Sequence, residues 1–211
     1  MLIVNNLRFG YQHRSILDGL SFHCKAAEVV HLAGPNGVGK STLMGILAGL
    51  LAEKDGEVRF EGPEGPTTDY RQHCEYLGAE ANGLYAKLDA MTNLRLWTAL
   101  RGRKPDDARL IAELSRWGLG SPLVYQDFAV EKFSTGMKRR LALARVSLSQ
   151  TRLWLLDEPF YGLDRNGIKV FQQALAEHLE QRGAVVIVSH DSEPLLPFKV
   201  RVIDLGHAIK H

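Results

Sequence analysis

Hydrophobic residues gather in three short, continuous runs that are rich in branched side chains. These runs are Val29–Ala33, Leu153–Leu156 and Val185–Val188. Each has the length of a strand that is buried on both faces of a parallel sheet. Apolar residues recur with helical spacing between the runs, most clearly over Thr42–Leu51, Thr135–Leu148 and Asn166–Gln181. Strands that alternate with helices predict an α/β layered fold.

Two other regions have a different pattern. Short segments near the N-terminus predict antiparallel strands, with a turn at Asp55-Gly56; they are Leu2–Arg8, Leu20–Lys25 and Glu57–Phe60. The region from Asn93 to Gln126 is mostly helical, and its charged stretch Arg101–Asp107 predicts a solvated loop in which Pro105 breaks the helices. We therefore expect an N-terminal antiparallel β subdomain, and a helical subdomain at about residues 90–150 inserted into the α/β core.

Polar residues follow each of the three apolar runs. The first run leads into a glycine-rich loop, the second into Asp157-Glu158 and the third into Ser189-His190. Ligands of open α/β sheets bind beyond the carboxyl ends of the strands. The three polar clusters therefore predict one shared site.

The glycine-rich loop matches the phosphate-binding pattern of P-loop proteins, Gly-x4-Gly-Lys-Ser/Thr. The candidate nucleotide-binding residues are Gly34, Pro35, Asn36, Gly37, Val38, Gly39, Lys40, Ser41 and Thr42. The glycines let successive N–H groups face phosphate oxygens, and the following helix adds its positive end. We expect Lys40 to bridge the β- and γ-phosphates of ATP and the Ser41 hydroxyl to bind Mg²⁺. A glycine turn before a helix is the alternative, but the preceding strand favours a nucleotide site.

The two acidic residues after the second run complete this chemistry. Asp157 fits the carboxylate that holds Mg²⁺ through water, and Glu158 is placed to polarise the attacking water as a general base. A solvated acidic pair at a strand end is the alternative interpretation.

The sequence Phe133-Ser134-Thr135-Gly136-Met137 precedes the second apolar run and opens an apolar helix. With the P-loop and Asp157-Glu158, it resembles the ATP-binding subunits of ABC transporters over nearly the whole chain, residues 1–211. In that family the signature at this place contacts the γ-phosphate of the opposite subunit's ATP. The resemblance therefore implies a head-to-tail pair of subunits, in which Ser134 and Gly136 complete the other subunit's site.

Four further residues each resemble one functional residue of the family. Tyr11 resembles the aromatic residue that stacks on adenine, with Phe9 as the second choice, or it is a core aromatic. Glu80 lies where the family has a glutamine that senses Mg²⁺, Asp164 resembles the aspartate of the loop after the catalytic glutamate, and His190 resembles the histidine that contacts the γ-phosphate. The sequence departs from the family at Glu80 and also at Met137, where a glutamine is usual.

Composition narrows the possible partners. Lys plus Arg (26) against Asp plus Glu (24) gives a net charge of +2, which makes no case for a nucleic-acid partner. Cys24 and Cys74 are expected to be reduced thiols. No apolar run approaches the roughly 18 residues that cross a bilayer. The family resemblance implies integral membrane permease subunits and a second ATP-binding subunit as partners, at the cytoplasmic face of the inner membrane.

Local features also suggest a subfamily. Tyr76-Leu77-Gly78 and the run from Leu153 through Phe160 are similar to the haem exporter ATPases of cytochrome c maturation. That similarity implies ATP-driven haem export, or release of a haem-loaded chaperone. Another small exporter ATPase, and a soluble ABC ATPase that acts as an assembly factor, are the alternatives.

Overall fold

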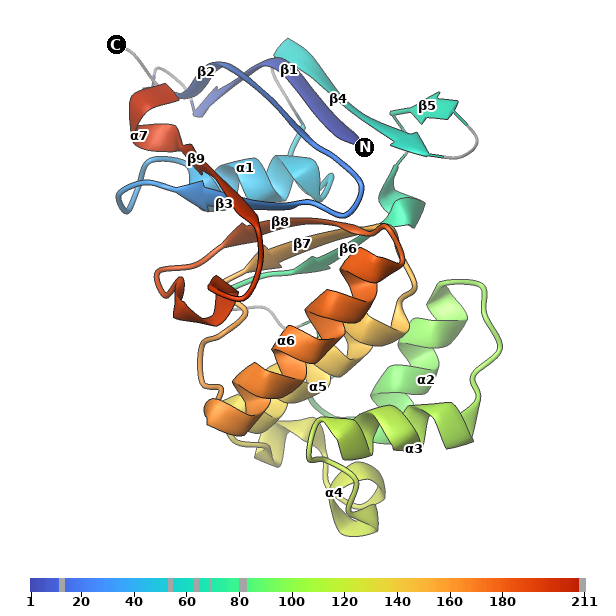
Figure 1. Cartoon of the computed structure of the whole chain (residues 1–211). Coiled ribbons are helices and arrows are strands. Elements are labelled where there is room, and N and C mark those ends of the chain that lie inside the picture. The colour runs from blue at the N-terminus through green and yellow to red at the C-terminus, as the bar shows by residue number, and fades with distance from the viewer. Residues whose placement is uncertain (12–13, 53–54, 63–64, 69, 80–82, 209–211) are drawn as a thin grey trace. The chain divides into compact units, whose positions relative to one another are not determined.

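The computed structural model describes residues 1–11, 14–52, 55–62, 65–68, 70–79 and 83–208. The chain forms two compact units (Figure 1). Unit 1 consists of Met1–Tyr76, Thr151–Asp157 and His178–His211, and unit 2 of Leu77–Gln150 and Glu158–Glu177. Among the helices of the described ranges, none has the length and apolar character needed to cross a bilayer.

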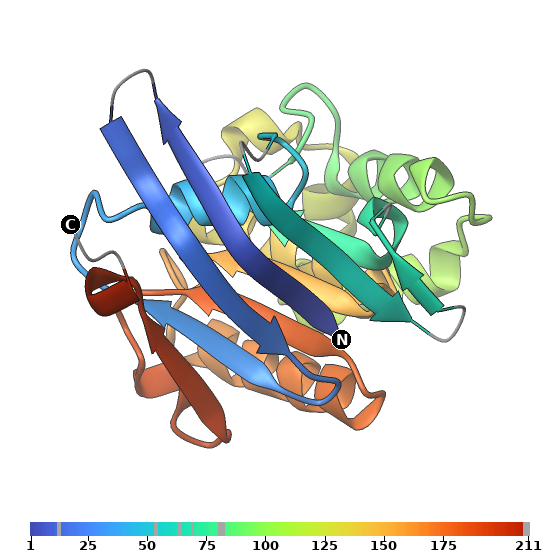
Figure 2. The ribbon, with the colours of Figure 1, turned by 90° about the horizontal axis from the view of Figure 1, so that it is seen from above.

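Unit 1 contains a four-stranded antiparallel sheet with the order β2-β1-β4-β5 (Figure 2). The strands are β1 (Leu2–Tyr11), β2 (Arg14–Cys24), β4 (Asp55–Gly62) and β5 (Gly65–Thr67). In the register, Leu2 faces Cys24 on one side and Phe60 on the other. The N-terminal antiparallel subdomain is therefore confirmed, with longer strands than predicted because pairing continues to Tyr11 and Arg14.

A five-stranded sheet with the order β6-β7-β8-β3-β9 forms the second layer of unit 1. Its strands are β3 (Val29–Ala33), β6 (Cys74–Leu77), β7 (Leu153–Asp157), β8 (Ala184–Val188) and β9 (Val200–Asp204). The pairs β7–β8, β8–β3 and β3–β9 are parallel. Every residue of β7 and β8 is buried, as the continuous apolar runs predict. The short helix α7 (Leu205–Ala208) follows β9.

Helix α1 (Lys40–Leu47) lies between the two sheets (Figures 1 and 2). Its buried residues Leu43, Met44 and Leu47 join the core made by both sheets. The helix ends four residues before the predicted Leu51. Gly49 adopts a left-handed conformation (φ 69°) and its N–H donates to the carbonyl of Ile46 at 2.8 Å, which ends the helix.

Unit 2 is helical. It contains α2 (Ala90–Leu100), α3 (Asp107–Arg116), α4 (Pro122–Gln126), α5 (Thr135–Leu148) and the part of α6 (Arg165–Glu180) up to Glu177. Single-turn 3₁₀ helices cover Arg71–His73 and Glu193–Leu195 in unit 1 and Val130–Lys132 in unit 2. Leu94, Leu110, Leu114, Phe133 and Leu141 form the centre of the helical core. Helix α5 has the predicted bounds.

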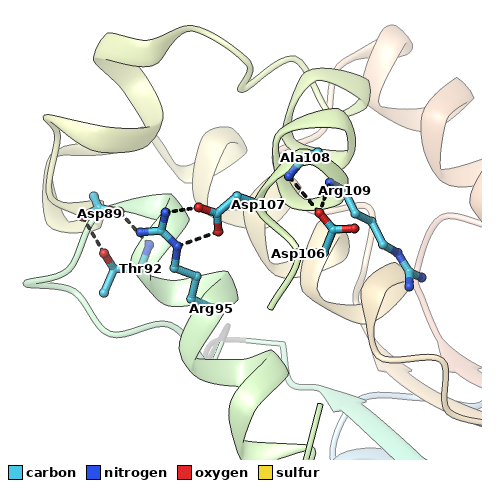
Figure 3. A network of polar contacts seen from close by, with 7 residues as sticks. All are labelled: Asp89, Thr92, Arg95, Asp106, Asp107, Ala108 and Arg109. Carbon is cyan, nitrogen blue, oxygen red and sulfur yellow. Dashed lines mark hydrogen bonds and ion pairs between the residues drawn. The ribbon is translucent and has the colours of Figure 1, made fainter. Parts of the chain in front are cut away.

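Acidic side chains cap the N-terminal ends of α2 and α3 (Figure 3). Asp89 caps α2 by accepting from the N–H of Thr92 at 2.7 Å, and Asp106 caps α3 by accepting from the N–H of Ala108 at 3.1 Å. Arg95 of α2 joins α3 through Asp107, with both nitrogen–oxygen distances below 3 Å. The charged stretch is thus a loop as far as Asp106, whereas Asp107 belongs to α3.

Candidate functional site

The glycine-rich loop joins β3 to α1 in unit 1. Gly34, Gly37 and Gly39 have φ values of 134°, 78° and 106°, all in the region that favours glycine. Gly39 is the N-cap of α1 and has no side chain with which to cap it. The positive end of α1 is therefore open to an anion, as a phosphate-binding loop requires.

Gly39 is also required by packing. A Cβ atom at this position would lie 2.7 Å from Cγ2 of Ile16, a residue of β2. Real Cβ atoms essentially never come that close to another heavy atom. Strand β2 of the antiparallel sheet therefore lies directly against the backbone of the phosphate-binding loop.

The Lys40 ammonium group is hydrogen-bonded to the backbone of the loop that precedes it. Its Nζ donates to the carbonyls of Gly34 at 2.6 Å and Pro35 at 3.0 Å, and the residue is only 9% exposed. Ser41 follows on the exposed side of the first turn of α1. A cation and a hydroxyl thus lie together at the open helix end, which fits the phosphates of a nucleotide.

Asp157 lies at the carboxyl end of β7, paired in register with Val188 of β8. It is 2% exposed, and α1 packs against its strand. Burial and the charge of Asp157 together raise the pKa of Tyr76 to about 12, so this phenol stays protonated near neutral pH. Within the described ranges, no three His, Cys, Asp or Glu side chains gather as a metal site. A single carboxylate at the strand end fits a Mg²⁺ ion that takes its other ligands from phosphate and water.

His190 lies just beyond β8, in a turn that is fixed on both sides. The Ser189 carbonyl contacts Nε2 of His31 on β3 at 3.0 Å. The Ser189 hydroxyl donates to the Asp191 carbonyl at 2.8 Å and accepts from the Asp191 N–H at 3.1 Å. The exposed His190 ring is therefore carried at the same edge of the sheet as Asp157 and the glycine-rich loop.

Ser134 and Gly136 lie in unit 2, at the start of α5. Ser134 is the exposed N-cap, and its hydroxyl accepts from the N–H of Met137 at 3.2 Å. A Cβ at Gly136 would lie 2.6 Å from the carbonyl oxygen of Gly162. The first turn of α5 is therefore packed directly against the loop that contains Gly162, backbone on backbone.

The same loop is fixed further along at Asp164. Its carboxylate accepts from the N–H of Gly167 at 2.7 Å and pairs with Arg140 of α5 at 2.6 Å. The Gly167 hydrogen bond and the Arg140 guanidinium lower the pKa of Asp164, so the carboxylate stays ionised. Glu158, where this loop begins, is half-buried and has the left-handed φ of 49°. Such a backbone at a non-glycine residue is uncommon and is often found at functional sites.

Two predicted site residues remain, Tyr11 and Glu80. Tyr11 is 54% exposed at the end of β1, with its ring edge-on to Phe9 at 5.0 Å. Phe9 is buried in the core, so of the two aromatic rings only Tyr11 can offer a face to a base. Glu80 lies outside the described residues.

Two functional candidates that the sequence did not single out are Arg139 and Arg140 of α5. Arg139 is 2% exposed, and its guanidinium donates to the carbonyls of Gly78 and Ala79. Arg140 binds Asp164, as described above. A helix pattern alone could not separate these roles, because the partners lie far away in the sequence.

Comparison with known proteins establishes the class. The sequence model of the ABC transporter family matches residues 17–161, more than half of the chain. The chain belongs to the ABC transporter family and is one of its ATPase subunits.

Two curated relatives are similar over nearly their full length. The cytochrome c biogenesis ATP-binding export protein CcmA of Escherichia coli O157:H7 is 36% identical over 97% of this chain and 96% of the relative. The protein of the same name from Xanthomonas axonopodis pv. citri is 34% identical over 97% and 94%.

Solved structures agree on the fold. An ATP-binding subunit of an ABC transporter has a TM-score of 0.82 and 25% identity, covering 97% of this chain and 86% of the other. A dimeric ATP-binding cassette in a post-hydrolysis state with ADP and Pi has a TM-score of 0.81 and 22% identity, covering 98% and 95%. The predicted α/β P-loop fold is therefore confirmed.

Proposed function

We propose that this ATPase subunit powers a membrane ABC complex that exports haem, or releases a haem-loaded chaperone, in cytochrome c biogenesis. The observation that carries the proposal is the end-to-end similarity to relatives named as cytochrome c biogenesis ATP-binding export proteins. An open phosphate-binding loop with Lys40 in place supports an active ATPase.

ATP binding is assigned to the residues at the start of α1. The N–H groups of the loop 34–39 and the Lys40 ammonium neutralise the β- and γ-phosphates, while the exposed Tyr11 ring stacks on adenine. Ser41 and Asp157, with Glu80 as a further ligand, would hold Mg²⁺, which would supply positive charge at the phosphates.

Hydrolysis requires a water molecule in line with the γ-phosphate. Glu158 accepts a proton from this water as the general base, and His190 contacts the γ-phosphate. Asp164 helps to hold the loop that begins at Glu158, through Arg140. These side chains raise the rate by positioning and electrostatics, as is usual for phosphoryl transfer.

Two copies of the chain close head to tail over two ATP molecules. The N-terminus of α5, with Ser134 and Gly136, then faces the γ-phosphate that the other copy holds. The closed pair has a higher affinity for ATP than for the products, so hydrolysis reopens it and shifts the membrane partners between states.

Residues 1–211 act as one ATP-binding domain, with its helical subdomain at about 90–150. The pair binds permease subunits at the cytoplasmic face of the inner membrane.

Genetic replacement with a matched control tests this function. A strain that lacks the chain receives the parent, Glu158→Gln or Arg116→Lys. Arg116 forms a surface ion pair with Glu177, remote in sequence from the site residues, and serves as the control. Covalently bound haem in c-type cytochromes should return with the parent and the control and stay absent with Glu158→Gln.

The tagged chain should also co-purify with a polytopic membrane protein. Normal cytochrome c assembly without the chain would overturn the haem assignment and favour another exporter. Absence of any membrane partner would favour a soluble assembly factor.

A further inference from the structure

His31 is a polar residue inside the buried strand β3. Its neighbours Val30 and Leu32 are core residues, and His31 itself is only 9% exposed. A buried imidazole costs free energy unless its N–H group finds an acceptor. The acceptor here is the carbonyl oxygen of Ser189, which lies 3.0 Å from Nε2. Because a carbonyl can only accept, Nε2 carries the hydrogen and His31 is the donor.

This hydrogen bond lies where β3 and β8 separate. The two strands are parallel, and the last pair in their register is His31 with Ile187. Beyond this pair, β3 continues in register with β9 as far as Ala33, while Val188 of β8 is paired with β7. The side chain of His31 therefore joins β3 to the exit of β8 at the point where the backbone pairing of the two strands ends.

The bond also fixes the direction in which the chain enters His190. The carbonyl of Ser189 belongs to the planar peptide unit that joins Ser189 to His190, so its direction sets the orientation of the whole unit. The Ser189 hydroxyl is hydrogen-bonded to the N–H and the carbonyl of Asp191, which fixes the shape of the turn. Those two bonds are local to the turn, whereas the bond from His31 ties the turn to β3.

Strand β3 leads into the phosphate-binding loop. The strand ends at Ala33, and the carbonyl of the next residue, Gly34, accepts from the Lys40 ammonium at 2.6 Å. His31 lies three residues before Gly34 and belongs to unit 1, as does the turn after β8. One side chain thus relates the turn that carries His190 to the strand that carries the loop.

We propose that His31 is a positioning residue for ATP hydrolysis. The inference rests on the proposed function, in which His190 contacts the γ-phosphate bound by the loop 34–39. His31 acts through Ser189 and not on the nucleotide: it holds the Ser189 carbonyl so that the His190 ring is presented to the γ-phosphate. A catalytic side chain that is misplaced by about 1 Å can cost about 100-fold in rate, so loss of this bond slows hydrolysis.

Three replacements of His31 distinguish a positioning role from a role in packing. Glutamine places its amide nitrogen near the position of Nε2 and can still donate to the Ser189 carbonyl. Asparagine is shorter and places its amide nitrogen near the position of Nδ1, out of reach of this carbonyl. Leucine fills the space without a donor. The assay is steady-state hydrolysis of MgATP by the full chain, together with the affinity for a fluorescent ATP analogue.

The rate constant should follow the donor and not the polarity of the side chain. His31→Gln should keep kcat within about twofold of the parent, whereas His31→Asn and His31→Leu should lower kcat by about 5–10-fold. Affinity for the ATP analogue should stay within about twofold in all three variants, because the phosphate-binding loop and Lys40 are unchanged.

His178→Leu is the matched control. His178 is a second buried histidine of unit 1, 7% exposed, and its Nε2 lies 3.3 Å from the carbonyl of Ala184, the first residue of β8. The same replacement therefore removes an imidazole–carbonyl contact at the opposite end of β8 from Ser189. It should lower the thermal stability, as His31→Leu does, and leave kcat at the parental value.

The outcomes separate the inference from the proposed function. Parental kcat in His31→Asn or His31→Leu overturns the inference and leaves the ATPase assignment intact. Equal losses of kcat in His31→Leu and His178→Leu, or in His31→Gln and His31→Asn, also overturn it, because they indicate a role in packing alone. If His31→Leu does not fold, the comparison of His31→Gln with His31→Asn decides. A parent chain that hydrolyses no ATP overturns the proposed function, and the inference with it.

Discussion

His178 should make the stability of the protein depend on pH, and the effect can be isolated with one substitution. The ring is stacked on Trp154, with centroids 3.9 Å apart, and the residue is 7% exposed. Its Nε2 lies 3.3 Å from the carbonyl of Ala184. Burial lowers the pKa of His178 from 6.5 to about 4, because the charged ring would lose its hydration.

The sign of the effect follows from this lowered pKa. The unfolded chain binds a proton at His178 once the pH falls below about 6.5, whereas the folded chain does so only near pH 4. Stability is therefore complete above about pH 6.5 and is lost as the pH falls between these two values. At 1.36 kcal/mol for each unit of pKa, the loss is about 2 kcal/mol at about pH 5 and about 3 kcal/mol below about pH 4.

Urea unfolding followed by circular dichroism, between about pH 7.5 and pH 5, measures this loss. His178→Gln cannot titrate but retains an amide that can donate to Ala184. Its free energy of unfolding should fall with pH by about 2 kcal/mol less than that of the parent. His23→Gln, at an exposed position on β2, is the matched control and should keep the parental slope. Equal slopes for the parent and His178→Gln would refute the role assigned to burial.

The remaining predictions concern the ATPase and its partners. Lys40→Ala should lose ATP binding in a fluorescent-nucleotide assay, because the positive charge at the phosphates disappears. Glu158→Gln should still bind ATP and accumulate as a dimer, with hydrolysis slowed at least about 100-fold. Hydrolysis by Glu158→Gln at the parental rate would show that another group is the base. Ser134→Arg should bind ATP as a monomer and fail to dimerise in light scattering, because a bulky cation crowds the partner's γ-phosphate; ATP-dependent dimers of this variant would contradict the head-to-tail pair. Leu84 and the exposed Tyr85 are apolar side chains next to Gly83, and we expect them to dock the membrane partner. The double change Leu84→Ser and Tyr85→Ser should therefore weaken recruitment to membranes in fractionation without changing nucleotide affinity, and undiminished recruitment would place the docking surface elsewhere.

The sequence predicted those elements whose formation depends on residues that lie close together in the chain. The runs that became β3, β7 and β8 are continuous and apolar because both faces of each strand are covered. Helix α5 begins at a serine cap and keeps its predicted bounds, Thr135–Leu148. The phosphate-binding loop was predictable too, since its glycines and its lysine are adjacent in the chain.

Elements that depend on distant partners were not predictable. Strand β6 has only four residues, and one of them is Glu75, which is 2% exposed although a charged residue suggests a surface position. The contacts of Arg139 with Gly78 and Ala79 span about 60 residues of sequence, so no helix pattern could indicate them. The roles of Tyr11, Glu80 and the other site residues stay predictions, because their chemistry depends on ligands and a second subunit.

The contact between Gly136 and Gly162 has a consequence for mutational scanning. Even alanine at position 136 would bring its Cβ to within 2.6 Å of a carbonyl oxygen, so this position should tolerate almost no replacement. In a selection for growth, Gly136 would therefore be as depleted of variants as Lys40, and steric exclusion alone is enough to cause this depletion. A parallel scan for protein abundance would separate the two. Gly136 variants should be lost from both data sets, whereas Lys40 variants should persist in the abundance data alone.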